Sequence, residues 1–346
     1  MMDLFIFDMD GVLIDVSKSY REAIRQTVGI YLRSCLGIQT KKTIISQEDI
    51  SLFKSTGGFN NDWDLTSGLL LYLLSASRLP PLPRKRTFPT LKENLLYLRE
   101  RSSRFRREVR TCRKRDLEMF TRRVKSFGGG LAGIRRAIGN SWDGWVYGSG
   151  DLKNENIVKR IFQEVYLGPR FFSGYHLQPF FYKGKGLYIR EKLLIPRRVL
   201  AALRKRVRLG IASGRPRFEA GLALKRFRLL PYFESIVTHD HCVEAQESLY
   251  RSTGKRKSLL KPHPYSLLRV IQEIGGSRPR CAYVGDVVDD MLAARAMKRR
   301  VPMLAIGFLN SRRDRGALRE SLLKAGADQV ISDPRDLLDL AASKSD

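Results

Sequence analysis

Long hydrophobic runs are missing from this sequence of 346 residues, because no apolar stretch approaches the roughly 20 residues of a membrane-spanning helix. The longest apolar stretch, Gly68–Ala76, is better explained as a buried helix. We therefore expect no membrane partner. Because an apolar strand begins almost at Met1, we also expect no leader peptide and a cytoplasmic protein, although the interior of an organelle would fit as well.

Cysteine and histidine are scarce, with four residues of each. The cysteines show no paired spacing, which favours a reducing compartment over a disulfide framework or a zinc site; they are Cys35, Cys112, Cys242 and Cys281. The segment THDHC, Thr238–Cys242, would need ligands from elsewhere to hold zinc. We expect it to be a polar loop that follows a strand.

Acidic residues are few relative to basic ones, since 35 Asp and Glu stand against 64 Lys and Arg for a formal net charge of +29. Such an excess favours anionic partners, including phosphorylated metabolites and nucleic acid. Nearly half of it lies in residues 78–136, where 19 basic and 5 acidic residues give +14. The alternative is a basic bias of the whole chain without a specific partner.

The length and the 43% hydrophobic content suggest two domains, or one domain with a large insertion. From about residue 193 onward, strand patterns alternate with helix patterns, which predicts an α/β fold with a Rossmann-like parallel sheet. The first strand, Leu4–Phe7, would join this sheet across the inserted segment. We therefore predict a core of residues 1–15 and 193–346 and a mainly helical cap of residues 16–192.

The predicted elements of the core follow the chain in alternation. The strands are expected at Leu4–Phe7, Val207–Ala212, Ser235–His239, Cys281–Gly285, Val301–Gly307 and Asp328–Ile331. The helices between them are expected at Val199–Arg206, Phe218–Phe227, Tyr265–Gly275, Asp289–Met297 and Arg315–Gly326.

The predicted cap contains helices at Ser19–Leu36 and Lys153–Tyr166 and a basic insertion at about 78–136. Within that insertion, Leu91–Val124 is expected to form one or two helices. A Pro-rich linker precedes them and FGGG at Phe127–Gly130 follows, so we expect a mobile appendage. In the alternative, apolar side chains of the insertion pack onto the cap and close over the crevice; they are Leu91, Leu95, Leu98, Phe105 and Val109.

Polar residues collect at the expected ends of the core elements. Asp8 and Asp10 follow the first strand, and Ser213 follows the strand that ends at Ala212. Lys261 precedes a helix, and acids follow the strand Cys281–Gly285 at Asp286, Asp289 and Asp290. Because the carboxyl ends of parallel strands share one crevice, these groups are expected to meet there. Clustered carboxylates repel unless a cation is present, and oxygen ligands suit Mg²⁺.

Four segments resemble the motifs of the haloacid dehalogenase superfamily of phosphotransferases. They are DMDGV, IASG, KPHP and GDVVDD, in the family's order and strand context. The insertion lies where the subfamily with a helical cap, subfamily IA, has it; this subfamily includes phosphoglycolate phosphatase. GGFNNDWDLT and GRPR resemble an uncharacterised branch predicted to contain phosphatases, some of which are linked to histidine biosynthesis.

The resemblance implies a role for each motif residue. Asp8 would be the nucleophile that forms an aspartyl phosphate, and Asp10 would be the general acid and base. Mg²⁺ would be held by the carboxylates of Asp8 and Asp286 and by the backbone carbonyl of Asp10. An acid at position 10 points to phosphatases and mutases, because both of their half-reactions need proton transfer.

The other motif residues would stabilise the transferring phosphoryl group. Ser213 would donate to a phosphoryl oxygen, and Lys261 would supply a fixed positive charge and keep the nucleophile ionised. Asp290 would orient Lys261 or the waters of the metal.

Further substrate-binding candidates come from two loops. Gly214 and Arg215 follow the second motif. Arg215 could reach a substrate anion, but we expect it to lie on the surface. The predicted polar-aromatic loop of the cap could contact the leaving group, or its tryptophan could simply pack inside the cap; its residues are Asn60, Asn61, Asp62 and Trp63.

The function predicted from these residues is a Mg²⁺-dependent phosphomonoesterase for a small phosphorylated metabolite, either phosphoglycolate-like or a sugar or histidine-pathway phosphate. A phosphomutase would share the same motifs. A third possibility is a nucleic-acid-associated protein or polynucleotide phosphatase that binds polyanions through the basic insertion.

Overall fold

The computed structural model describes residues 2–39, 44–59, 61–77, 79–84, 88–103, 114–139, 142–276, 278–310 and 315–342. The chain divides into two compact units. The first unit comprises Met1–Val16 and Glu191–Asp346, and the second comprises Ser17–Arg190. These boundaries lie within two residues of those expected for the core and the cap.

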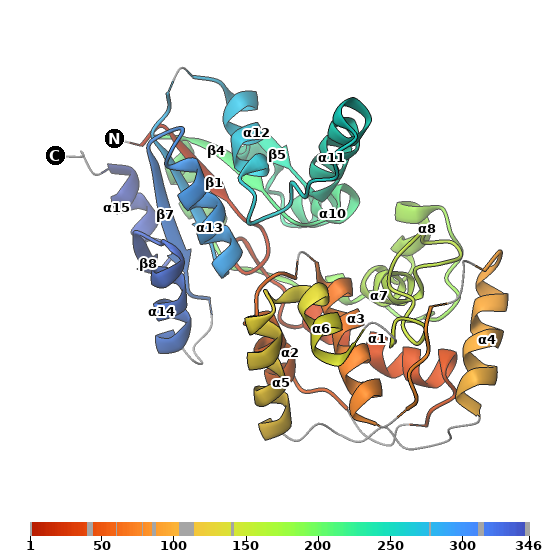
Figure 1. Cartoon of the computed structure of the whole chain (residues 1–346). Coiled ribbons are helices and arrows are strands. Elements are labelled where there is room, and N and C mark those ends of the chain that lie inside the picture. Colours follow the sequence, from red (N-terminus) through yellow and green to blue (C-terminus); the bar gives the residue numbers. More distant parts are fainter. Residues whose placement is uncertain are drawn as a thin grey trace. The chain divides into compact units, whose positions relative to one another are not determined.

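The first unit contains a six-stranded parallel sheet in the order β5-β4-β1-β6-β7-β8 (Figure 1). The strands are β1 Leu4–Phe7, β4 Arg208–Ala212, β5 Ser235–Val237, β6 Cys281–Gly285, β7 Met303–Phe308 and β8 Gln329–Ile331. The predicted α/β sheet is confirmed, and β1 joins it in the middle. Phe7 lies opposite Ile211 on β4 and Val284 on β6, so these three strands end at the same edge.

Helices cover both faces of the sheet because successive strand residues point to opposite sides. Phe5 and Phe7 pack in one apolar cluster, whereas Leu4 and Ile6 pack in the other. The first cluster includes residues of α9 (Arg197–Arg204), α10 (Arg217–Arg226) and α15 (Asp336–Ala342). The second includes residues of α12 (Tyr265–Ile274), α13 (Val288–Met297) and α14 (Arg315–Ala325). Both faces of β1 are therefore buried, and its polar neighbours lie beyond its end.

A helix stands where a polar loop was predicted after β5, so that prediction was wrong. The helix α11 spans His239–Thr253 and begins directly after Thr238. The backbone N–H of Thr238 donates to Nδ1 of His241 at 2.9 Å, which engages this ring in capping the helix.

Two shorter strands, β2 (Ile14–Asp15) and β3 (Lys192–Leu193), pair antiparallel. A 3₁₀ turn, η4, spans Leu230–Tyr232.

The second unit is helical in its described part. Its helices are α1 Tyr20–Ile30, η1 Tyr31–Cys35, α2 Gln47–Lys54, α3 Asp62–Ala76, α4 Leu91–Ser103, α5 Lys114–Ser126, α6 Gly130–Ile138, α7 Ile157–Leu167, α8 Arg170–Tyr175 and η3 Leu187–Arg190. α1 and α7 meet through aromatic rings, with the centroid of Tyr20 4.4 Å from that of Tyr166 and 5.7 Å from that of Phe162. The apolar stretch Gly68–Ala76 is buried inside α3, apart from its two exposed or half-buried last residues. α7 begins four residues later than expected, because the side chain of Asn156 caps it.

The described part of the basic insertion packs into the second unit, so the expectation of a mobile appendage was wrong there. Leu91, Leu95 and Leu98 of α4 are buried, as are Leu117 and Val124 of α5. The hydroxyl of Ser102 in α4 also donates to the carbonyl of Leu36 at 2.6 Å. Burial of these leucines thus determines how the segment packs despite the basic charge of the surrounding sequence, and the packing part of the alternative is confirmed for them. Closure over the crevice stays a prediction. Its other two residues, Phe105 and Val109, lie outside the described residues.

The glycines after α5 make a close backbone contact rather than a hinge. The N–H of Gly130 donates to the carbonyl of Gly57 at 2.8 Å. A Cβ atom on Gly129 would lie 2.5 Å from that same carbonyl oxygen. Only glycine therefore lets the turn between α5 and α6 approach residues 56–58 so closely.

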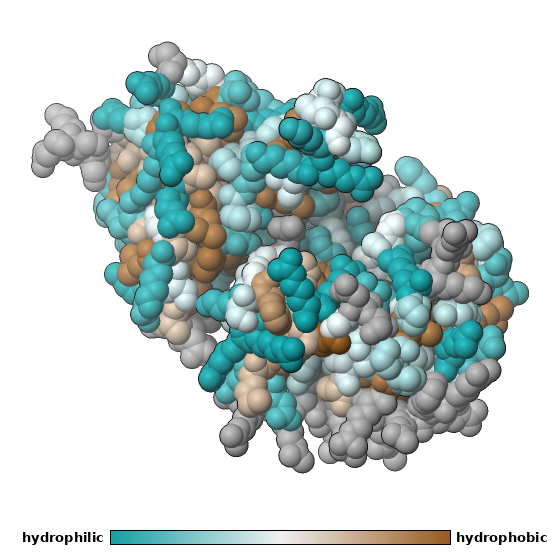
Figure 2. Space-filling view, viewed as in Figure 1, coloured by the Kyte–Doolittle hydropathy of each residue, from teal (hydrophilic) through white to brown (hydrophobic). Residues whose placement is uncertain are grey.

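Hydrophilic side chains dominate the face drawn in Figure 2, and the brown apolar patches are small and scattered. On α5, Arg122, Arg123 and Lys125 are exposed. Binding of polyanions to this basic surface stays a prediction.

Among the described residues, no helix combines the length and the apolar character needed to cross a membrane. Three of the four cysteines are described, and Cys35, Cys242 and Cys281 are buried free thiols.

The packing of α4 can be tested with Leu98, which is fully buried. Leu98→Ala should lower the free energy of unfolding by about 2–5 kcal/mol, because it removes buried methyl groups and leaves a cavity. The matched control is Leu96→Ala on the same helix, where the side chain is 57% exposed; it should change stability by less than about 0.5 kcal/mol. Urea or thermal unfolding measures both. Equal, small effects would mean that α4 does not pack.

Candidate active site

Asp8 occupies the first position after the central strand β1. Its backbone N–H donates to the carbonyl of Val284 on β6 at 2.9 Å, which continues the sheet pairing by one residue. Its side chain is 10% exposed. The sheet thus delivers a carboxylate into a largely buried position at the carboxyl edge.

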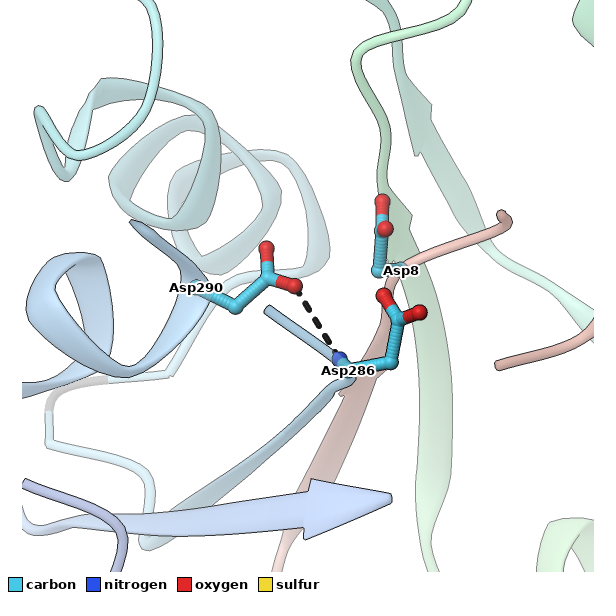
Figure 3. Close-up of side chains that lie close together, drawn as sticks. All are labelled: Asp8, Asp286 and Asp290. Atoms are coloured by element: carbon cyan, nitrogen blue, oxygen red, sulfur yellow. Dashed lines mark hydrogen bonds between the residues drawn. The ribbon is translucent and has the colours of Figure 1, made fainter. Parts of the chain in front are cut away.

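Three carboxylates converge at this edge (Figure 3). Asp8 comes from the end of β1, Asp286 from the end of β6, and Asp290 from the first turn of α13. Each offers an oxygen atom within 4.8 Å of the others. Like charges this close repel strongly when partly buried, so the group requires compensating positive charge.

Lys261 supplies part of that charge. Its ammonium Nζ lies 2.9 Å from Asp8 Oδ1 and 2.8 Å from Asp290 Oδ1, donating to both. Three carboxylates and one ammonium leave two negative charges when all are ionised. This balance, together with a donor set made only of oxygen, fits a divalent cation such as Mg²⁺.

The bonds of Asp290 show which carboxylates would hold the ion. Oδ1 of Asp290 accepts from Lys261 and from the hydroxyl of Tyr283 at 2.8 Å. Oδ2 accepts from the backbone N–H groups of Asp286 and Val287 at 3.1 and 3.3 Å. Since both oxygens of Asp290 are engaged by protein donors, Asp8 and Asp286 are the better direct ligands. Asp290 orients Lys261 and caps α13.

The protonation of Asp8 reflects opposing effects of its surroundings. Burial raises the pKa of Asp8 to about 7; Lys261 opposes this shift, and the carboxylates of Asp290 and Asp10 add to it. Burial lowers the pKa of Lys261, but Asp290 and Asp8 outweigh it and hold that pKa well above its ordinary value. A cation beside Asp8 would favour its ionised form.

Gly11 makes room for the carboxylate of Asp286. Its φ is +79°, a left-handed conformation that favours glycine. A Cβ atom there would lie 1.9 Å from Oδ2 of Asp286. The turn is also held by the side chain of Asn310, whose Nδ2 donates to the carbonyl of Gly11 at 2.5 Å. The glycine that follows the paired acids is thus a requirement of the site's geometry.

Asp10 and the segment after β4 form a second polar group. The side chain of Asp10 is 30% exposed and forms an ion pair with Arg215. Arg215 is fully buried, so its expected surface position was wrong. Ser213 is buried at the end of β4, and its hydroxyl accepts from the backbone N–H of Arg215 at 3.1 Å. Gly214 connects these two residues.

The candidates of the second unit belong to a helix start rather than to the predicted polar loop. Oδ1 of Asn61 accepts from the N–H of Asp64 at 2.7 Å and caps α3. Asp62 pairs with Lys54 at 2.9 Å, and the ring of Trp63 packs against Phe162. Asn60 lies outside the described residues. Contact of these residues with a substrate stays a prediction.

Sequence reasoning missed three participants: Tyr283, Asn310 and Glu191. Tyr283 is the one hydroxyl-bearing residue within the buried strand CAYVG, which was an unused signal. Asn310 follows shortly after β7, a position comparable to that of the other strand-end residues. Glu191 pairs with Arg215 at 3.1 Å, and no local pattern marks it.

Part of the chain matches a known protein family. Residues 171–298 match the family model of haloacid dehalogenase-like hydrolases. That range includes Ser213, Lys261, Asp286 and Asp290, and the structure adds Asp8 to them. Over this range the chain is similar to haloacid dehalogenase-like hydrolases.

Solved structures share the fold of this chain. Phosphatase Tt82 from Thermococcus thioreducens is 20% identical, with a TM-score of 0.52 and coverage of 92% of this chain and 99% of that one. A conserved haloacid dehalogenase-like protein of unknown function from Agrobacterium tumefaciens is 18% identical, with a TM-score of 0.50 and coverage of 99% and 98%.

One curated relative matches over a short stretch. Imidazoleglycerol-phosphate dehydratase from Phytophthora nicotianae is 37% identical over 76 residues, which is 22% of this chain. The match spans only 15% of the length of that relative.

The role of Gly11 can be tested by cation binding. Gly11→Ala should weaken Mg²⁺ binding by at least about tenfold, because the new methyl group displaces the carboxylate of Asp286. The control is Gly254→Ala: its φ is +67°, but no described atom lies within 4 Å of the added Cβ. It carries the same backbone strain and should leave the affinity unchanged. Isothermal titration calorimetry with Mg²⁺ measures the affinity of both variants. Unaltered Mg²⁺ binding by Gly11→Ala would contradict the proposed collision between the added methyl group and the carboxylate of Asp286.

Proposed function

We propose that this protein is a Mg²⁺-dependent phosphomonoesterase that acts through an aspartyl phosphate on Asp8. One observation supports this most: the buried carboxylate of Asp8 is paired with Lys261 inside an acidic group, and a second, partly exposed acid follows two residues later. Phosphoryl transfer needs an in-line nucleophile, compensation of charge on the phosphoryl oxygens and a proton for the leaving group. This chain offers a residue for each need.

In the first half-reaction, a carboxylate oxygen of Asp8 would attack phosphorus while the bond from phosphorus to the ester oxygen breaks. Asp10 would give its proton to that oxygen, so that an alcohol leaves. The ammonium of Lys261 would offset the negative charge near the phosphoryl group, and the Ser213 hydroxyl would donate to a phosphoryl oxygen.

In the second half-reaction, water would attack the phosphorus of the aspartyl phosphate. Asp10, now ionised, would take a proton from this water. Inorganic phosphate leaves, Asp8 is regenerated as a carboxylate, and Asp10 is protonated again. The sum is ester plus water giving alcohol plus phosphate, so no further reactant is needed.

Mg²⁺ would be held by the carboxylates of Asp8 and Asp286 and, as the family resemblance implies, by the backbone carbonyl of Asp10. When bound, the ion would neutralise charge on the phosphoryl oxygens. The three carboxylates carry three negative charges when ionised, and Lys261, which pairs with Asp8 and Asp290, offsets one of them. A dication would balance the two that remain.

The substrate class we infer is a small phosphorylated metabolite. The name of the relative with the short match contains a phosphate ester of this size, imidazoleglycerol phosphate. A phosphomutase would use the same residues but would transfer the phosphoryl group instead of releasing it. Measuring free phosphate against transfer product distinguishes the two reactions.

The nucleophile can be tested by replacing Asp8. Asp8→Asn should lower phosphate release by at least about 10³-fold, because the amide keeps the shape of the carboxylate without its nucleophilic charge. Asp289→Asn is the matched control, since this half-buried acid of α13 lies outside the group of three carboxylates. Phosphate release over a panel of metabolite phosphates and circular dichroism are the two measurements. Activity of a folded Asp8→Asn within tenfold of the parent would rule out this nucleophile.

The metal can be tested by exchange. Phosphate release should require Mg²⁺, stop in a chelator, and fall by at least about tenfold in Ca²⁺. Ca²⁺ takes 6–8 looser oxygen ligands and would disturb the attack geometry of Asp8. Steady-state rates in each ion provide the comparison, with restoration by excess Mg²⁺ as the control. Full turnover in chelator or in Ca²⁺ would argue against the metal site.

A further inference from the structure

A buried arginine, Arg215, lies between the carboxylates of Asp10 and Glu191. Nε of Arg215 donates to Oδ1 of Asp10. On its other side, Nη2 donates to Oε1 of Glu191 at 3.1 Å, and Nη1 approaches Oε2 at 3.4 Å. The side chains of Arg215 and Glu191 are 0% and 1% exposed. A buried guanidinium is tolerated only when it is paired, so Asp10 and Glu191 together hold this charge.

The backbone of Arg215 is fixed on both sides. Its N–H donates to the hydroxyl of Ser213, and its carbonyl accepts from the N–H of His239 at 2.9 Å. The helix α10 begins at Arg217, two residues later. The guanidinium therefore extends from a rigid point between the ends of β4 and β5.

Glu191 is anchored as well. Its carbonyl accepts from Nη1 of Arg226, at the end of α10, at 3.2 Å. The next residues, Lys192 and Leu193, form β3 and pair with Asp15 and Ile14 of β2. The segment that follows Asp10 is thus tied to the segment that follows Glu191, and the two carboxylates face Arg215 from connected pieces of backbone.

We propose that Arg215, held in place by Glu191, is a positioning residue that fixes the carboxyl group of Asp10, which carries a proton in the first half-reaction, for transfer of that proton to the leaving group. This inference rests on the proposed phosphatase function and names a requirement of its acid–base step. The side chain of Asp10 keeps 30% of its surface exposed, so the carboxylate remains accessible to a leaving group. Arg215 itself is buried beneath Asp10 and is bonded to two carboxylates, which argues against direct contact with the substrate.

Positioning matters because a general acid must lie within about 2.6–3.2 Å of the atom that it protonates. An unheld aspartate samples several rotamers, and a misplacement of about 1 Å can cost 10²-fold in rate. Lysine would keep the positive charge but lacks the planar fork that binds Asp10 and Glu191 at once. The loss should fall on substrates that need the proton, namely esters with poor leaving groups.

The experiment compares an alkyl ester, glycerol 3-phosphate, with an aryl ester, 4-nitrophenyl phosphate, on the full chain with Mg²⁺. Arg215→Lys should lower kcat for the alkyl ester by about 10²-fold and for the aryl ester by less than about fivefold. Glu191→Gln should show the same selectivity with a smaller loss. In the Asp10→Asn background, Arg215→Lys should cause no further loss, because the residue that it positions is already inactive.

The control is Arg217→Lys, an exposed arginine on α10 that pairs with Glu244; it should leave both rates unchanged. If Arg215→Lys does not fold, Glu191→Gln tests the proposal instead. Its loss in kcat should be larger for the alkyl ester than for the aryl ester. Equal losses on both esters, a rise in KM alone, or an additive loss in the Asp10→Asn background would overturn the positioning role. If the parent protein released phosphate from neither ester nor from any metabolite phosphate, the proposed function would fail and the positioning role with it.

Discussion

The ammonium of Lys261 between Asp8 and Asp290 is the interaction on which the whole site depends. Without it, three carboxylates would face one another in a space that is largely removed from water, where their repulsion is poorly screened. Lys261 reduces that charge to a value that a dication can balance. It also links the strand that carries the proposed nucleophile to the helix that carries Asp290. The same two ion pairs therefore offset the negative charge and hold the carboxylates in position.

The sheet explains how these groups meet. β4, β1 and β6 are neighbours, and Phe7 at the end of β1 lies opposite Ile211 and Val284, each one residue before the end of its strand. Ser213, Asp8 and Asp286 therefore follow the ends of three adjacent strands at a single edge. Close packing then requires small residues at defined points. Gly11 is one of them, because any side chain there would collide with the carboxylate of Asp286. The segment after β1 must therefore supply both the carboxylate of Asp8 and the glycine that leaves room for Asp286.

Much of this could be predicted from the sequence because its signals are local. A short apolar strand followed by polar residues marks Asp8, Ser213 and Asp286, and a parallel sheet brings such positions together. The burial of α4 was harder to predict, because its leucines lie within a strongly basic sequence. The start of α11 was missed because it depends on a cap formed by His241, a residue more familiar as a ligand.

The pairing of Asp10, Arg215 and Glu191 could not be predicted. Its members lie far apart in the chain and have no periodic relation, and their contact depends on the packing of α10 and β3. The pairing also explains why Arg215 is not a surface residue: two carboxylates compensate the cost of burying it. Long-range ion pairs of this kind become visible only when the fold is known.

The central claim is that Asp8 becomes covalently phosphorylated during turnover. Rapid acid quenching of the protein with Mg²⁺ and a turned-over phosphate ester, followed by mass spectrometry of proteolytic peptides, tests it directly. The account predicts a phosphoryl adduct on Asp8 that hydroxylamine removes, as expected of an acyl phosphate. A phosphoryl group on another residue, or steady turnover without any adduct on Asp8, would contradict it.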